Sequence, residues 1–279
     1  MKVLITGASG LVGTECVEVL PRSGIELISL GRTPVGDLPH IHWDLRDSLP
    51  AAALPSAVDG VVHLAMSRAI RDSPVAAEEV FGVDCAAGVA LAAAAARRGA
   101  SICVYASSGA AESSAVTDAA APLRFYASVK RATELLLGNL VPTVSLRLYF
   151  PFSPRRPCMV RTIAERVAAG LPVRLRGDDG VRLNPIPARD VAEAVGRALA
   201  HSPATIDVAG SEVVTLRDLA TRIGTRLGIE PVFVADPDAG REAPIGDYAQ
   251  TAALLERDPQ PLDAALDELV AGLRGADRR

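Results

Sequence analysis

Residues 1–13 read Met-Lys-Val-Leu-Ile-Thr-Gly-Ala-Ser-Gly-Leu-Val-Gly and combine a short apolar run with three evenly spaced glycines. The run at 3–5 is bounded by turn residues and predicts a buried strand, while residues 14–20 predict a helix. A strand that turns sharply into a helix leaves unpaired backbone N–H groups at the helix start, beside the positive end of its dipole. Such a turn can bind the pyrophosphate of a dinucleotide.

Each glycine of this turn has a separate expected role. Gly7 allows the tight turn, Gly10 the close approach of phosphates, and Gly13 the close packing of helix on strand. The spacing G-x-x-G-x-x-G is one residue longer than G-x-G-x-x-G. A glycine triplet alone is weak evidence because turns use glycine freely. Its place directly after an N-terminal strand nevertheless predicts nucleotide binding.

Size and charge restrict the class of protein. The chain has 279 residues, 49% of them hydrophobic, which is enough for one large α/β domain or slightly more. Its net charge of −4, without a basic tract, argues against nucleic acid as a partner. No apolar run reaches the roughly 18 residues of a membrane span, and the N-terminus lacks a signal-peptide pattern. We therefore expect a cytoplasmic protein without a membrane partner.

The cysteines suggest neither a disulfide framework nor a metal site. Cys16, Cys85, Cys103 and Cys158 are widely spaced and match no known pairing or zinc pattern. We expect four reduced thiols, most of them buried as small apolar groups, and no metal.

Strands and helices alternate along the first half of the chain. After the first strand, further strands are predicted at 25–30, 58–65, 101–106 and 143–149, together with a short strand that ends at 42–44. Helices are predicted at 74–98 and 125–137. This alternation indicates a parallel sheet with right-handed crossovers and helices on both faces.

The pattern changes after residue 151, where prolines become frequent. Helices are predicted at 159–169, 188–200, 215–227 and 262–273, a strand at 205–208, and a polar loop at 236–247. We predict a first domain at 1–150, with a returning segment near 186–208, and a smaller lobe at 151–279.

Tyr126 and Lys130 are the most informative pair of side chains. Residues four apart on a helix lie on one face, one turn from each other. An ammonium beside a phenol favours the phenolate, which makes tyrosine a usable proton donor or acceptor. Ser107 and Ser108 follow the strand at 101–106, and open α/β sheets bind ligands at that edge. A serine hydroxyl there could hold a substrate carbonyl together with Tyr126.

With these residues in place, the sequence resembles the extended short-chain dehydrogenases/reductases, in the branch of the NAD-dependent epimerases and dehydratases. The resemblance covers about residues 1–210 and implies a Rossmann-type, doubly wound parallel sheet with a smaller C-terminal substrate-binding lobe. The matching segments are TGASGLVG (6–13), VHLA (62–65), VYASS (104–108), YASVK (126–130), Leu146-Arg147 with Pro151, and Asn184-Pro185-Ile186 with Asp190-Val191-Ala192.

The resemblance implies a catalytic set of Ser108, Tyr126 and Lys130, with Ser108 rather than Ser107 at the serine position. Tyr126 would exchange a hydroxyl proton while hydride moves to or from the nicotinamide. Lys130 would bind the nicotinamide ribose, and Ser108 would orient the carbonyl. The residues implied to bind cofactor are Gly7, Ser9, Gly10, Leu11, Val12, Gly13, Arg32, Asp44, Leu45, Leu64, Ala65, Tyr126, Lys130 and Tyr149. Those implied to contact substrate are Ser67, Phe150, Arg155 and Asn184.

One departure from the family concerns the cofactor. NAD-preferring members usually carry an acidic residue after the second strand, to hold the ribose 2′-hydroxyl. Here that place reads Leu-Gly-Arg-Thr at 30–33, with no acid before Asp37. Arg32 could bind a 2′-phosphate, although a solvated loop arginine is the simpler alternative. We expect NADP(H) to be preferred, with NAD(H) possible.

Other departures concern the substrate. The family's substrate-phosphate asparagine is Phe150 here, and the loop between Ser108 and Tyr126 is short, with Glu112-Ser113 in place of Tyr-Gly. Both argue against a standard UDP-sugar epimerase. Arg155, Arg161 and Arg182 could still bind an anionic substrate, or be surface charges.

Further residues have structural interpretations. The family asparagine in the helix after the fourth strand is Asp84, which we expect to change only a packing contact. We expect His63 to be a satisfied core histidine, Trp43 a core anchor near the adenine site, and Asp190 a residue that caps or pins the following helix.

These observations predict an NADP(H)-dependent ketoreductase that reduces the carbonyl of a 4-keto-sugar nucleotide, with Tyr126 as general acid. The enzyme alternatives are an NAD-dependent sugar-nucleotide epimerase and a reductase of a non-sugar, polyketide-like carbonyl. The non-enzyme alternative is a cofactor-binding sensor or scaffold. The resemblance also implies a homodimer formed through the helices at 74–98 and 125–138.

Overall fold

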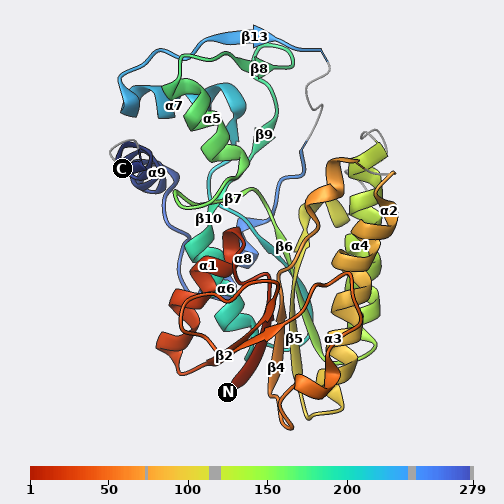
Figure 1. Ribbon diagram of the computed structural model, residues 1–279. Coiled ribbons are helices and arrows are strands. Elements are labelled where there is room, and N and C mark those ends of the chain that lie inside the picture. Colours follow the sequence, from red (N-terminus) through yellow and green to blue (C-terminus); the bar gives the residue numbers. More distant parts are fainter. Residues whose placement is uncertain (73–74, 113–120, 238–242, 277–279) are drawn as a thin grey trace. The chain divides into compact units, whose positions relative to one another are not determined.

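The computed structural model describes residues 1–72, 75–112, 121–237 and 243–276 (Figure 1). The chain divides into two compact units. Unit 1 comprises Met1–Arg147 and Ala192–Ile206, and unit 2 comprises Leu148–Val191 and Asp207–Arg279. The sequence placed the boundary at 150 and the returning segment at 186–208, whereas the contacts place them at 147 and 192–206.

Seven strands form the central sheet, in the order β11-β6-β5-β4-β1-β2-β3. Their bounds are β1 (Lys2–Thr6), β2 (Glu26–Gly31), β3 (His40–His42), β4 (Gly60–His63), β5 (Ile102–Ser108), β6 (Thr143–Leu148) and β11 (Ala204–Val208). In the parallel register Leu4 lies beside Ile28 and Val61, and Val62 beside Val104. The strand order reverses between β1 and β4. Ligands of open α/β sheets bind at the carboxyl ends of the strands beside such a reversal.

Helices cover both faces of this sheet. The helices and helical turns of unit 1 are α1 (Leu11–Val19), η1 (Leu20–Ser23), η2 (Ala51–Ala53), η3 (Arg68–Asp72), α2 (Ala77–Phe81), the π-helical turn η4 (Gly82–Ala86), α3 (Ala87–Ala96), η5 (Gly109–Ala111), α4 (Ala121–Gly138) and the unit 1 part of α6 (Ala188–Ala198). Figure 1 shows α2, α3 and α4 on one face and α1 and α6 on the other. This arrangement confirms the predicted Rossmann-type fold.

The core beneath α3 and α4 explains why the alanine-rich run is helical. Ala92, Ala94 and Ala95 are fully buried beside Leu91 and Tyr105. Alanine has the highest helix propensity, and its small side chain lets the helix lie close to the sheet. The sequence predicted one helix at 74–98. The structure instead has the π-helical turn η4 between α2 and α3, and Pro74 lies outside the described residues.

Unit 2 is built from short strands and amphipathic helices. Its elements are β7 (Pro151–Phe152), α5 (Met159–Ala168), β8 (Val173–Leu175), β9 (Arg182–Leu183), β10 (Ile186–Pro187), β12 (Val214–Thr215), α7 (Leu216–Leu227), β13 (Phe233–Ala235), α8 (Tyr248–Leu255) and α9 (Leu262–Ala276). β7 pairs with β10, β8 with β13, and β9 with β12. The buried side chains Ile163, Leu219 and Leu266 join α5, α7 and α9 in one core.

The helical stretch Ala77–Ala96 is, by length and composition, apolar enough to cross a membrane, although Glu78, Glu79 and Asp84 interrupt it. Half of its most apolar 18-residue window is buried inside the structure, and core helices of globular proteins meet the same criteria. The finding is therefore weak evidence for a membrane span.

Candidate active site

The glycine-rich turn joins β1 to α1 as the sequence predicts. Gly7 has a φ of 71°, and a Cβ on it would lie 2.7 Å from the amide nitrogen of Ala65. A Cβ on Gly13 would lie 2.1 Å from the carbonyl oxygen of Gly7. Both positions therefore require glycine. At Gly10 an added Cβ would meet only the Gly7 oxygen, at 3.1 Å.

This geometry suits the diphosphate of a dinucleotide. Gly10 precedes Leu11, the first residue of α1, and its own N–H donates to Gly7. The first N–H groups of a helix have no partner within the helix. They lie beside the positive end of the helix dipole, where a phosphate is stabilised. The residues around Gly7, Gly10 and Gly13 thus fit the cofactor that the family implies.

Arg32 and Asp44 follow neighbouring strands at the predicted adenine end of the site. Arg32 is exposed after β2. Asp44 accepts hydrogen bonds from Arg46 at Nη2 (2.6 Å), Nε (3.0 Å) and the backbone N–H (3.1 Å). These bonds, helped by the charges of Arg46 and Arg32, lower the pKa of Asp44 to about 2. Asp44 is therefore ionised, and its charge is partly neutralised by its arginine neighbour.

Ser107 and Ser108 end β5, and the structure gives their hydroxyls different partners. Ser107 is buried, and its Oγ donates to Glu134 Oε1 over 2.6 Å. Ser108 is partly exposed, and its Oγ accepts the N–H of Ala110 over 3.2 Å. The Ser107 hydroxyl is thus engaged inside unit 1. This arrangement favours Ser108 over Ser107 as the serine available to a ligand, and the catalytic assignment stays a prediction.

Tyr126 and Lys130 lie one turn apart on α4, which packs on β5. The Lys130 Nζ lies 5.6 Å from the centre of the Tyr126 ring and 5.0 Å from that of Tyr105. It donates to the carbonyl oxygen of Ala106 over 3.1 Å. Only 2% of Lys130 is exposed, whereas Tyr126 is partly exposed. The structure therefore holds a buried ammonium close to a phenol that can reach a ligand.

Asp84 contradicts the expectation of a mere packing change. Its side chain is fully buried, and its Oδ1 lies 3.5 Å from Lys130 Nζ. The sequence missed this ion pair because the two residues are 46 positions apart (130 − 84) and only the packing of α4 on η4 brings them together.

A second buried carboxylate, Glu134, was also missed. It accepts hydrogen bonds from Ser107, from Arg131 over 2.8 Å, and from Arg147 through Nε and Nη2 over 3.1 and 3.2 Å. Burial raises the pKa of Glu134, but the bonds from Arg147, Ser107 and Arg131 outweigh it and hold the pKa below its ordinary value. Its place one turn after Lys130 was the available signal. The carboxylate joins β5, α4 and β6 beneath the candidate catalytic residues.

His63 and Trp43 have structural roles. The His63 Nδ1 lies 2.7 Å from Thr6 Oγ1, and the ring stacks on Tyr105. Its buried Nε2 has no hydrogen-bond partner among the described residues, so the histidine is only half satisfied. Burial lowers the pKa of His63 to about 3, so the imidazole is neutral. Trp43 is buried in the core of unit 1, and its indole N–H donates to Asp47 O over 3.1 Å.

In unit 2, Asn184 is occupied by the main chain. Its amide group donates to Gly246 O over 2.8 Å and to Gly210 O over 3.4 Å, and its oxygen accepts the Gly246 N–H over 3.2 Å. These bonds, in a side chain that is 1% exposed, favour a structural role over the predicted contact with substrate.

The other predicted residues of unit 2 are placed as follows. Tyr149 is buried, and its ring packs so closely on Gly246 that a Cβ there would lie 2.5 Å from it. Phe150 has a φ of 49°, a strained conformation for an aromatic residue. Asp190 accepts hydrogen bonds from Arg257 Nη2 over 2.6 Å and from the Gln260 N–H over 2.8 Å, so it pins the segment between α8 and α9.

The remaining predicted positions are more ordinary. Ser67 is buried, and its Oγ donates to Glu79 over 2.9 Å. Arg161 bonds to Glu165 and to the Pro154 carbonyl, and Arg182 is exposed on β9. The backbone N–H of Arg155 donates to Ser153 Oγ over 3.2 Å.

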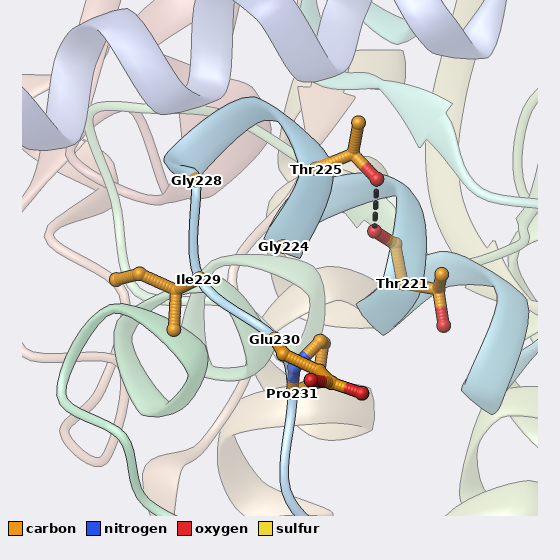
Figure 2. Close-up of a pocket in the computed structure, with 7 residues that line it drawn as sticks. All are labelled: Thr221, Gly224, Thr225, Gly228, Ile229, Glu230 and Pro231. Atoms are coloured by element: carbon orange, nitrogen blue, oxygen red, sulfur yellow. Dashed lines mark hydrogen bonds between the residues drawn. The ribbon is translucent and has the colours of Figure 1, made fainter.

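Figure 2 shows a pocket at the C-terminal end of α7 in unit 2, away from every predicted site residue in the sequence. Its lining residues are Thr221, Gly224, Thr225, Gly228, Ile229, Glu230 and Pro231. Glu230 is the only ionisable side chain among them, and the Thr225 hydroxyl donates back to Thr221 O over 3.0 Å. This pocket offers no set of groups for acid–base chemistry.

The chain belongs to the NAD dependent epimerase/dehydratase family, whose model matches residues 3–209. This confirms the resemblance to the extended short-chain dehydrogenases/reductases and identifies the protein as an NAD(P)-dependent enzyme of that type. A comparison with curated proteins found no match.

Solved structures similar to this one include the UDP-glucose 4-epimerase of Thermus thermophilus in complex with NAD. It is 26% identical, with a TM-score of 0.82 over 99% of this chain and 100% of that one. MoeE5 in complex with UDP-glucose and NAD is 22% identical, with a TM-score of 0.84 over 99% of each chain. UDP-glucose 4-epimerase of Thermotoga maritima with UDP-glucose is 19% identical, with a TM-score of 0.84 over 99% of each chain. The last two likenesses, both under 25% identical, show a shared fold.

Proposed function

We propose that this protein is an NAD-dependent sugar-nucleotide epimerase that works through a transient ketone. The observation that carries the proposal is the buried Lys130 ammonium beside Tyr126, on a helix packed against the strand that ends at Ser108. The 26% identity to an NAD-bound UDP-glucose 4-epimerase, over the whole chain, supports the same substrate class.

In this proposal the turn at Gly7, Gly10 and Gly13 binds the diphosphate of the cofactor. A nicotinamide bound there would supply a reversible hydride acceptor for a sugar carbon. Tyr126 takes the proton from the hydroxyl on that carbon and later gives it back, with Lys130 stabilising the phenolate. Ser108 donates a hydrogen bond to the oxygen as it becomes a carbonyl. Because the hydride and the proton are both returned, no net oxidation occurs.

The test is interconversion of UDP-glucose and UDP-galactose without added cofactor, followed by nuclear magnetic resonance. The wild type should convert either sugar to the same mixture and release NAD on denaturation. Tyr126→Phe should lose at least about a hundredfold in turnover, the scale of a lost general acid–base. Retained turnover in Tyr126→Phe would overturn the assignment.

The ketoreductase remains a second candidate because of one observation. Arg32 is exposed directly after β2, where NAD-preferring members of the family usually carry an acidic residue. Its positive charge helps to lower the pKa of Asp44. As a reductase, the protein would bind NADPH more tightly than NADH and consume it with a ketone substrate. Fluorescence titration measures the preference. Arg32→Ala should abolish it, whereas equal affinity in the wild type would rule this candidate out.

A homodimer is the proposed assembly. Leu135, Leu136 and Leu140 of α4 and the turn after it are 55%, 45% and 40% exposed, and Phe81 of α2 is 49% exposed. Both helices lie on the same face of the unit 1 sheet (Figure 1). Large apolar side chains exposed on the same layer of helices are the kind of surface that an interface between subunits covers.

A further inference from the structure

Asp84 lies on the π-helical turn η4 and faces Lys130 inside unit 1. Its Oδ1 is 3.5 Å from the Lys130 Nζ, and its Oδ2 accepts the N–H of Ser67 over 2.7 Å. The side chain of Asp84 is 0% exposed and that of Lys130 is 3% exposed. Isolated π-helical turns often occur at functional sites.

The surroundings of Lys130 leave Asp84 as its one buried counter-ion among the described contacts. Tyr105 of β5 and Tyr126 of α4 present ring faces to the ammonium, and Ala106 a carbonyl oxygen. Burial raises the pKa of Tyr105 to about 12, so its phenol is neutral. His63, stacked on Tyr105, is neutral as well.

Other titratable groups on elements packed against α4 lack a described contact with Lys130. They are Arg68 and Asp72 of η3, Glu78 and Glu79 of α2, Cys85 of η4 and Cys103 of β5. On α4 itself, Arg131 and Glu134 bond to each other, and Arg124 lies at the exposed side.

We propose that Asp84 is a positioning residue, whose carboxylate keeps the Lys130 ammonium charged and fixed beneath Tyr126. A buried ammonium without a counter-ion loses its proton more easily or leaves its site. The opposing effects are visible in the structure. Burial lowers the pKa of Lys130, but the negative charges that Tyr105, Tyr126 and Asp84 carry when ionised raise it overall. Burial likewise raises the pKa of Asp84, against the attraction of Lys130.

This inference rests on the proposed function, because Lys130 matters most if Tyr126 handles protons. Its first measurement nevertheless needs neither substrate nor turnover. Lysine occurs in this sequence only at positions 2 and 130. Protein labelled with ¹³C at lysine Cε therefore gives two resonances, which Lys130→Met assigns. Lys2 pairs with Glu26 at the surface and provides an internal reference.

The test compares the pH titration of the Lys130 resonance in wild type, Asp84→Asn and the control Glu78→Gln. Asp84→Asn keeps an oxygen for the Ser67 N–H but removes the charge. It should move the Lys130 titration to lower pH by about one unit or more, with Lys2 unchanged. Glu78→Gln, which removes a charge from α2 that is not buried, should leave both resonances in place. An unchanged Lys130 titration in Asp84→Asn would overturn the inference.

Turnover separates this inference from the proposed function. Asp84→Asn should lower kcat with little change in KM, and move the alkaline limb of the pH profile in the same direction as the resonance. If Asp84→Asn shifts the Lys130 titration but the wild type converts no sugar nucleotide, the ion pair is supported and the epimerase is rejected. If Asp84→Asn does not fold, the charges of both partners of the ion pair can be removed together. Asp84→Asn with Lys130→Met should then recover folding, and failure to recover it would contradict a counter-ion role.

Discussion

At the scale of single residues, the sequence revealed positions whose role is local. Gly7 and Gly13 could be assigned because a positive φ or a close backbone approach leaves a direct trace in the sequence. Tyr126 and Lys130 could be paired because helical spacing is fixed. Asp84 and Glu134 could not be understood in this way. Lys130, the ion-pair partner of Asp84, and Ser107 and Arg147, which bond to Glu134, lie on other elements, so these contacts become visible only in the folded structure.

Asn184 offers a prediction at this scale. Asn184→Ala removes the bonds to Gly246 and Gly210 and leaves buried main-chain groups unpaired, so it should lower the free energy of unfolding by about 2–4 kcal/mol. The control is Asn139→Ala, which removes an exposed bond to Leu135 O and should change stability by less than about 0.5 kcal/mol. Urea unfolding measures both. If Asn184→Ala is as stable as the wild type but binds substrate poorly, Asn184 contacts the substrate, as the sequence predicts, and its structural role is rejected.

At the scale of elements, the strands of the sheet and the long helices followed from periodicity, and β1, β2, β5 and α4 begin or end close to the expected residues. The small pairs β8–β13 and β9–β12 did not, because two or three residues carry no readable period. The interruption of the helix at 74–98 by η4 was equally hidden. A one-residue widening of a helical turn is a response to packing, and alanine-rich sequence permits it without marking it.

The junction of β5, α4 and β6 gives the prediction at this scale. Since the pKa of Glu134 is lowered on folding, its contribution to stability is present above the unfolded value, near about 4.3, and is lost as pH falls below it. Glu134→Gln should lower the free energy of unfolding at pH 7 by about 2–3 kcal/mol and flatten its dependence on pH below about 5.

The control for Glu134 is Glu165→Gln, which removes a half-exposed carboxylate paired with Arg161 on α5. It should change stability by at most about 1 kcal/mol, as exposed pairs do. Unfolding curves from about pH 3 to 7 provide the comparison. Equal losses for the two variants would show that the Glu134 network contributes no more than a surface pair.

At the scale of the whole molecule, the fold class and the family were accessible because they depend on several motifs in a fixed order. The kind of reaction was not. The sequence-based choice of ketoreductase depended on single departures at Arg32 and Phe150, while similarity over the whole chain favours an epimerase. Phe150 is held at a φ of 49° in unit 2, a conformation that asparagine adopts more readily than an aromatic residue does.

The proposed homodimer is tested at this scale by light scattering. Leu136→Glu places a charge among the exposed leucines of α4 and should convert a dimer into a folded monomer. Leu171→Glu, at a leucine of unit 2 that is 49% exposed, is the matched control and should leave the dimer intact. A wild type that is monomeric at micromolar concentration would end the proposal.

The most direct measurement of the central claim follows the hydride itself. UDP-glucose carrying deuterium at C4 is incubated with the protein and no added cofactor, and the product is analysed by nuclear magnetic resonance. An epimerase that returns the same hydride should give UDP-galactose with the deuterium still at C4. Loss of the label from C4, or no conversion by a folded protein that carries NAD, would contradict the account.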